Sequence, residues 1–217
     1  MKITSVDVIT MKRQDFCAQT PVICRINTDE GLYGYGEAGV SINDFSLGSA
    51  KLLELFAKSI IGMNPLEIDV IWSKLYSNFW AQGSGGVIMA AISAIDVALW
   101  DIKGKYFNVP VYMLLGGKHR DKLRAYASQL QNGWGYEEFL RSPGDLGFLR
   151  EACVAAIEDG YDAVKIDFIN KYEDGKRMGT DILKNWIPPN LMNLFVKRVE
   201  VAREAVGPDV DIIMENH

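Results

Sequence analysis

The sequence has few cysteines, no long apolar run and no excess of basic residues. Its three cysteines, Cys17, Cys24 and Cys153, are scattered and show no CxxC spacing, so neither a disulfide framework nor a zinc site is expected. The longest apolar run near the middle of the chain, residues 87–95, is far shorter than the roughly 20 residues of a membrane span. The 23 Lys and Arg against 28 Asp and Glu give a net charge of −5. This balance argues against nucleic acid as the main partner, because phosphate binding needs a basic surface.

The amino terminus also lacks the apolar segment of a secretory signal, because residues 1–7 alternate in the manner of a strand. We therefore expect a cytoplasmic protein that does not enter the membrane. A hydrophobic fraction of 48% and a charged fraction of 24% are ordinary for a globular protein and exclude a disordered, collagenous or coiled-coil chain. The 217 residues leave room for one large domain, or for a small domain and part of another.

Strand patterns come first in the chain and helix patterns follow them. Strands are expected over residues 3–10, 22–27 and 32–37, and helices over residues 49–60, 66–80 and 87–105. The Asp29-Glu30-Gly31 turn joins the last two strands into a hairpin, so the strands form an antiparallel meander. Strands followed by helices predict a small α+β domain over residues 1–117, and residues 110–122 are expected to contain a linker.

Beyond the linker, over residues 118–217, strands and helices alternate. Strands are expected over residues 123–127, 163–167 and 211–215, and helices over residues 144–159 and 190–206. This order predicts right-handed βαβ units and a parallel sheet. A parallel strand needs covering helices and neighbouring strands, yet no helix follows the last one. We therefore expect that these residues belong to a longer polypeptide, or that another chain supplies the rest of the fold.

Gly34, Gly36 and Gly39 match the GxGxxG pattern of dinucleotide-binding proteins. That fingerprint needs a parallel strand before it and a helix that opens on it, whereas these glycines lie on the returning arm of a hairpin. We favour a hairpin whose glycines allow close packing. On the apolar helix, Asp96 and Asp101 are interpreted as hydrogen-bond partners in helix packing.

Ionisable residues gather where two neighbouring parallel strands end. Lys165 and Asp167 lie two apart at the end of one strand, and Glu215 and His217 at the end of the next, so each pair is expected to share a face. Parallel α/β folds place their active sites at this edge. Converging charges are costly unless they hold a metal or a substrate. A carboxylate suits Mg²⁺ and an imidazole suits proton transfer, while a surface ion pair and a frayed chain end are the alternatives.

Three stretches give the chain a resemblance to a known family. Residues 28–38, residues 94–105 and residues 110–117 resemble the enolase superfamily, in its mandelate racemase/muconate lactonizing enzyme-like branch. The resemblance implies an α+β capping domain followed by a (β/α)₇β barrel, of which about the first three strands are present. It also implies one Mg²⁺ held by acidic residues at the ends of three successive strands. Glu215 matches the first of these ligands, and the other two would lie on strands that this sequence lacks.

Within this family the second barrel strand often ends in Lys-x-Lys, with the second Lys acting as base. Lys165 matches the first lysine and Asp167 replaces the second, which speaks against a lysine-based racemase or cycloisomerase. His217 is similar to the histidine that assists loss of the β-hydroxyl in the family's sugar-acid dehydratases. The general base of that subgroup, often a His-Asp dyad, lies on later strands.

The resemblance therefore implies a Mg²⁺-dependent hydro-lyase acting on an aldonate or aldarate. Removal of the α-proton builds negative charge that Mg²⁺ and a cation such as Lys165 can hold, and His217 can protonate the leaving oxygen. Asp167 can orient Lys165 or accept a sugar hydroxyl. The alternatives are a racemase, epimerase or cycloisomerase of the same superfamily, or a catalytically inactive fragment or assembly module.

The capping domain sets part of the specificity in this family, through loops that close over the barrel mouth. The corresponding segments are residues 12–20 and 40–47, which offer polar side chains to sugar hydroxyls. These side chains are Arg13, Gln14, Gln19, Asn43 and Asp44. The expected partners are thus a small anionic sugar acid, Mg²⁺ and further copies of the chain in a homo-oligomer.

Overall fold

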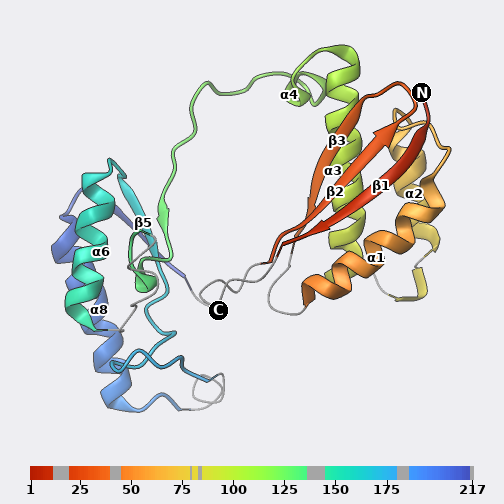
Figure 1. Cartoon of the computed structure of the whole chain (residues 1–217). Coiled ribbons are helices and arrows are strands. Elements are labelled where there is room, and N and C mark those ends of the chain that lie inside the picture. The colour runs from red at the N-terminus through yellow and green to blue at the C-terminus, as the bar shows by residue number, and fades with distance from the viewer. Residues whose placement is uncertain are drawn as a thin grey trace. The chain divides into compact units, whose positions relative to one another are not determined.

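The computed structural model describes residues 1–11, 20–39, 45–78, 80–82, 85–135, 145–179 and 186–215 (Figure 1). The chain divides into two compact units, Met1–Asp121 and Lys122–His217. The division falls in the charged segment that follows Gly117, the residue at which the first domain is expected to end. Among the described residues, no helix is both long and apolar enough to cross a bilayer.

The first unit contains the expected antiparallel meander. Its strands are β1 (Ile3–Thr10), β2 (Val22–Thr28) and β3 (Tyr33–Ala38), paired in the order β1-β2-β3. Every second residue of β2 from Val22 is fully or almost fully buried, which gives the sheet one core-facing side. The turn between β2 and β3 needs a glycine at Gly31, where φ is +80°.

Helices lie on the buried side of this sheet (Figure 1). They are α1 (Phe45–Ile60) and α3 (Gly86–Phe107), which contact the strands, and α2 (Ile68–Asn78), which packs on the other two helices. The sheet and the three helices share one hydrophobic core. The second helix is shorter than the 66–80 expected, because the chain makes a turn at Pro65-Leu66 and the helix ends at Asn78. A single 3₁₀ turn, η1 (Trp80–Gln82), follows it.

The glycines of β3 let that strand lie directly against α3. A Cβ added at Gly34 would overlap the Ala98 carbonyl oxygen, and one added at Gly36 would overlap the Ala94 carbonyl oxygen. Close packing, rather than dinucleotide binding, therefore accounts for these two glycines. Asp101 of α3 accepts a hydrogen bond from the Tyr35 backbone N–H at 2.9 Å, which confirms its expected role in packing.

The segment expected to contain a linker, residues 110–122, also includes a one-turn helix, α4 (Val111–Leu114). Pro110 precedes it with φ at −59°, a value already suited to a helix start. The Leu115 N–H closes the turn by donating to the Val111 carbonyl at 3.2 Å.

The second unit is built on a parallel sheet. Its strands are β4 (Ala127–Ser128), β5 (Ala163–Ile166) and β6 (Asp211–Met214), in the order β4-β5-β6. The helices α6 (Leu146–Glu158) and α8 (Pro189–Val206) connect them and pack on Val164 and Ile166, as the alternation of strands and helices predicts. A 3₁₀ turn, η2 (Leu130–Asn132), follows β4.

The first strand of this sheet is much shorter than expected. Residues 123–126 are not strand, and pairing begins only at Ala127, opposite Val164. Because β5 itself begins at Ala163, the residues before Ala127 have little strand to pair with. The prediction of a strand over 123–127 is therefore wrong for four of its five residues.

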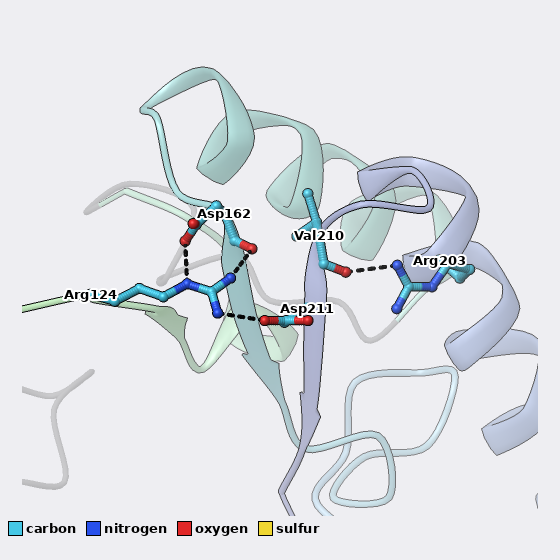
Figure 2. Close-up of polar contacts among 5 residues, drawn as sticks. All are labelled: Arg124, Asp162, Arg203, Val210 and Asp211. Carbon is cyan, nitrogen blue, oxygen red and sulfur yellow. Dashed lines mark hydrogen bonds and ion pairs between the residues drawn. The ribbon is translucent and has the colours of Figure 1, made fainter.

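Arginine side chains tie together the amino-terminal ends of these strands (Figure 2). Arg124 donates to the Asp162 carboxylate and carbonyl, both at 2.9 Å, and to the Asp211 carboxylate at 2.5 Å. Arg203 donates to the Val210 carbonyl at 2.7 Å, which joins the end of α8 to the entry into β6. The opposite, carboxyl-terminal edge carries the candidate site.

Candidate active site

The structure brings Lys165 and Glu215 together at the carboxyl-terminal edge of the sheet. Glu215 follows β6 directly, and its backbone N–H donates to the Ile166 carbonyl at 3.0 Å, which extends the ladder by one residue. The Lys165 Nζ lies 2.6 Å from the Glu215 Oε1, and the two side chains are 21% and 14% exposed. The hydrogen bond with Glu215 raises the pKa of the Lys165 ammonium, while partial burial opposes this shift.

Amide side chains from the end of β4 complete this cluster. The Gln129 Nε2 donates to the Glu215 Oε2 at 2.7 Å. The Gln129 Oε1 accepts from the Gln131 Nε2 at 2.6 Å and from the Asn132 Nδ2 at 3.4 Å. No role is predicted for these amides from the sequence, although they follow a predicted strand at the same edge as Lys165 and Glu215, a signal that could have found them.

Asp167 lies one residue beyond β5 and has a different environment from Lys165. Its carboxylate accepts from the Ile169 backbone N–H at 3.2 Å, and its own N–H donates to the Gln131 Oε1 at 3.1 Å. It is 5% exposed and lines a small cavity of about 20 Å³ together with Arg198. The expectation of a face shared with Lys165 assumes that the strand continues to residue 167, whereas it ends at Ile166.

Two basic residues fasten the loop that follows β5. The buried Arg198 of α8 donates to the carbonyls of Phe168, Lys171 and Tyr172 at 2.9, 2.7 and 3.3 Å. The Lys171 Nζ donates to the Asn132 Oδ1 at 2.8 Å. Burial lowers the pKa of both basic groups, and neighbouring arginine charges lower that of Lys171 further.

The other predicted site residues lie outside the described part of the chain. They are His217 at the carboxyl end and, in the two expected capping loops, Arg13, Gln14, Gln19, Asn43 and Asp44. Their proposed roles therefore remain predictions from the sequence.

Among the described residues, Glu215 is suited to be one ligand of a magnesium site. Within the described ranges, no group of three or more His, Cys, Asp or Glu residues is close enough to hold a metal ion. Glu215 is a hard oxygen donor at the strand end, as Mg²⁺ prefers. Lys165 and Gln129 each bind one of its oxygens.

Comparison with known proteins gives the chain its family. Residues 3–116 match the N-terminal domain of the mandelate racemase / muconate lactonizing enzyme family. The D-mannonate dehydratase of Novosphingobium aromaticivorans is 32% identical over 222 residues, with 100% of this chain and 53% of the relative covered. The D-galactonate dehydratase of Variovorax paradoxus is 43% identical over 198 residues, with 89% and 44% covered.

A solved structure agrees with these relatives. A member of the enolase superfamily from Salmonella Typhimurium is 41% identical, with a TM-score of 0.90 over 100% of this chain and 55% of that one. The chain thus spans about half the length of the relatives that it matches. It belongs to the mandelate racemase / muconate lactonizing enzyme family of the enolase superfamily.

Proposed function

We propose that this chain supplies the capping domain and the first three barrel strands of a Mg²⁺-dependent sugar-acid dehydratase. The family match covers the capping domain, and relatives are named as dehydratases of D-mannonate and D-galactonate. The observation that carries the proposal is the ion pair between Lys165 and Glu215 at the ends of neighbouring parallel strands. This is the edge at which parallel (β/α) barrels hold their active sites.

The parallel sheet of the second unit is consistent with the start of such a barrel. Its strands follow one another in sequence order, and α6 and α8 connect them. The polar groups collect at the carboxyl edge, whereas the Arg124 contacts close the amino edge. In barrels of this type the carboxyl edge carries catalysis and the amino edge carries stability.

Lys165 would stabilise the charge that develops when the α-proton leaves. The α-carbon of a sugar acid is adjacent to a carboxylate, so deprotonation adds negative charge to an existing anion. An ammonium held beside this position lowers the barrier, because a fixed charge needs no reorganisation during the reaction. A lysine of ordinary pKa is already protonated near neutral pH, and the hydrogen bond with Glu215 raises the pKa of Lys165 further.

Glu215 would supply one ligand of the Mg²⁺, and further strands would supply the others. When bound, the ion adds Lewis-acid stabilisation of the same negative charge. His217, two residues further on, would deliver a proton to the leaving β-hydroxyl. For Asp167 we propose a positioning role, because its carboxylate is buried in the loop and its N–H holds Gln131.

The capping-loop residues would bind the sugar hydroxyls. We retain Arg13, Gln19, Asn43 and Asp44 for this role, on the strength of their place in the sequence and the family of the capping domain. Hydroxyl recognition by such groups would determine which acid is dehydrated, because an unpaired buried polar group is penalised.

The proposal is tested by assaying the enzyme that contains these residues against D-mannonate, D-galactonate and an aldarate with Mg²⁺. A 2-keto-3-deoxy acid is the expected product. Lys165→Met should lower kcat by about 10²–10³-fold, the range for loss of one electrostatic donor. Lys197→Met, at an exposed position of α8, is the matched control and should leave kcat unchanged.

The outcomes separate the alternatives. Exchange of the α-proton in D₂O without a keto product would rule out the dehydratase proposal and favour an epimerase or racemase. No turnover of any kind by the complete enzyme would leave an inactive assembly module. The 217-residue chain alone is expected to show no Mg²⁺-dependent turnover, because its described part offers one metal ligand.

A further inference from the structure

Gln129 has an unusual backbone conformation for its residue type. Among the described residues, the non-glycine positions with positive φ are Asn108 at 54° and Gln129 at 67°. Asn108 caps the carboxyl end of α3, where asparagine is a common choice. Glutamine has no such local reason to adopt the left-handed region, which is unfavourable for a residue with a long side chain.

The surrounding backbone holds Gln129 in this conformation. Its N–H donates to the Lys165 carbonyl at 3.0 Å, and its carbonyl accepts from the Asn132 N–H at 2.9 Å. One bond continues the pairing with β5 and the other closes η2, so the residue is fixed on both sides. The strained conformation of Gln129 is thus maintained at the point where the chain leaves β4. At this point the Gln129 side chain contacts Glu215.

The orientation of the Gln129 amide follows from the Asp167 backbone N–H, which can only donate a hydrogen bond. The Asp167 backbone N–H donates to the Gln131 Oε1, which fixes the Gln131 amide with its nitrogen toward Gln129. The Gln131 Nε2 then donates to the Gln129 Oε1, which leaves the Gln129 Nε2 to face Glu215.

A second fixed donor points the same way. The Lys171 ammonium donates to the Asn132 Oδ1, so the Asn132 Nδ2 is the atom turned toward the Gln129 Oε1. The series of hydrogen bonds through Gln131 and the one through Asn132 therefore give the same result: the Gln129 amide presents its N–H donor to the Glu215 carboxylate.

We propose that Gln129 is a positioning residue for the Glu215 carboxylate, and that Gln131 sets its orientation. This inference rests on the proposed function for its link to Mg²⁺, but the positioning itself does not depend on activity. Gln129 holds one carboxylate oxygen and Lys165 holds the other, and these two contacts fix the plane of the Glu215 carboxylate that would bind a cation. Groups that orient a metal ligand in this way contribute strongly to metal affinity.

The first test observes the hydrogen bond in the 217-residue chain by nuclear magnetic resonance of ¹⁵N-labelled side-chain amides. We expect one Gln129 amide proton to be shifted downfield and to exchange slowly with solvent. Glu215→Gln and Gln131→Leu should each remove this signature. Asn108→Gly, at the other positive φ position, should leave it unchanged. Rapid exchange of both Gln129 amide protons in the wild-type chain, or a signature that survives Glu215→Gln, overturns the proposal.

The second test separates positioning from stability. Gln129→Gly removes the amide and also relieves the positive φ, whereas Gln129→Leu removes the amide and keeps the strain. We expect Gln129→Gly to match or exceed the wild type in thermal stability, and Gln129→Leu to fall below it. In the complete enzyme, both should bind Mg²⁺ about 10- to 100-fold more weakly, measured by calorimetric titration.

The two proposals fail in different ways. If the complete wild-type enzyme binds Mg²⁺ while Gln129→Gly binds it within twofold of the wild type, the positioning role is overturned and the dehydratase proposal stands. If the wild type neither binds Mg²⁺ nor dehydrates any sugar acid, the proposed function fails, and the amide signals alone decide whether Gln129 holds Glu215.

Discussion

Replacing Gly36 by alanine should destabilise the first unit strongly, although the change adds only one methyl group. The new Cβ would overlap the Ala94 carbonyl oxygen and lie 2.9 Å from the Ala98 nitrogen. Both atoms belong to the backbone of α3, so they cannot rotate away as a side chain can. The strand or the helix must move instead. Overpacking of a core costs about 1–3 kcal/mol, and we expect about 3 kcal/mol here because backbone must shift.

Gly39→Ala is the matched control, three residues along the same chain segment. Gly39 is exposed, and a Cβ there would have no heavy atom within 4 Å. Its alanine variant should be neutral or more stable by about 0.4–1 kcal/mol, because alanine lowers the entropy of the unfolded chain. Urea unfolding, followed by circular dichroism and tryptophan fluorescence, measures both variants. At about 1–3 kcal/mol per molar urea, the Gly36→Ala midpoint should fall by about 1–3 M.

The sign of the effect makes this comparison decisive. Alanine in a strand is intrinsically no worse than glycine, so propensity alone predicts that both variants are at least as stable as the wild type. Equal urea midpoints for Gly36→Ala and Gly39→Ala would refute the close approach of β3 to α3. Glycine at position 36 would then need another explanation.

Three further measurements test the charged groups. Burial raises the pKa of Asp96, so the folded state resists its ionisation and loses stability as pH rises. Asp96→Asn should therefore stabilise the chain at pH 7, by less than about 1 kcal/mol because solvent screens the site. This gain should vanish near pH 3, where the aspartate is protonated in both the folded and the unfolded state. The Lys165 Cε signal should titrate above the ordinary lysine pKa in the wild type and return toward it in Glu215→Gln, whereas equal midpoints would argue against the ion pair. Arg198→Met should lower the free energy of unfolding by about 2–3 kcal/mol, because it removes charge-assisted hydrogen bonds from a buried guanidinium to three loop carbonyls, and Arg203→Met at an exposed site should cost less.

Much of the fold follows from local patterns in the sequence. The alternation of Val22, Cys24 and Ile26 predicts the buried face of β2, and these side chains are fully buried. The apolar stretch from Val87 onward predicts a helix that must be covered, and α3 packs against β3, α1 and α2. Such patterns suffice where each residue's environment repeats with the period of the strand or helix.

The errors arise where distant residues decide the outcome. The strand expected over residues 123–127 has the right composition, but its length depends on where β5 begins to pair with it. Asp167 has the spacing of a residue that shares a face with Lys165, but the strand ends before it. Neither the partner's length nor the end of a strand is visible in a two-residue spacing.

The charged residues of the candidate site could be predicted from the sequence, whereas its amide side chains could not be assigned a role. Lys165 and Glu215 stand out because charges at the ends of apolar strands need a reason. Gln129 and Gln131 carry no charge and follow no period, so their position just after a predicted strand is the one sequence feature that marks them. Their hydrogen bonds join residues 86 and 36 positions apart, to Glu215 and to Asp167, which only the folded chain brings together.

The contacts of Arg124 with Asp162 and Asp211 have a consequence for how this sheet can diverge. They lie at the starts of β5 and β6, and Lys165 is three residues beyond Asp162, which is about 10 Å along the strand at roughly 3.3 Å per residue. Substitutions so far apart, with no shared partner, have nearly independent effects on folding. Residues around Lys165 can therefore be substituted during adaptation to a new substrate without disturbing the alignment of the strands. The contacts of Arg124 keep the amino-terminal edge of the sheet intact while the carboxyl-terminal edge changes.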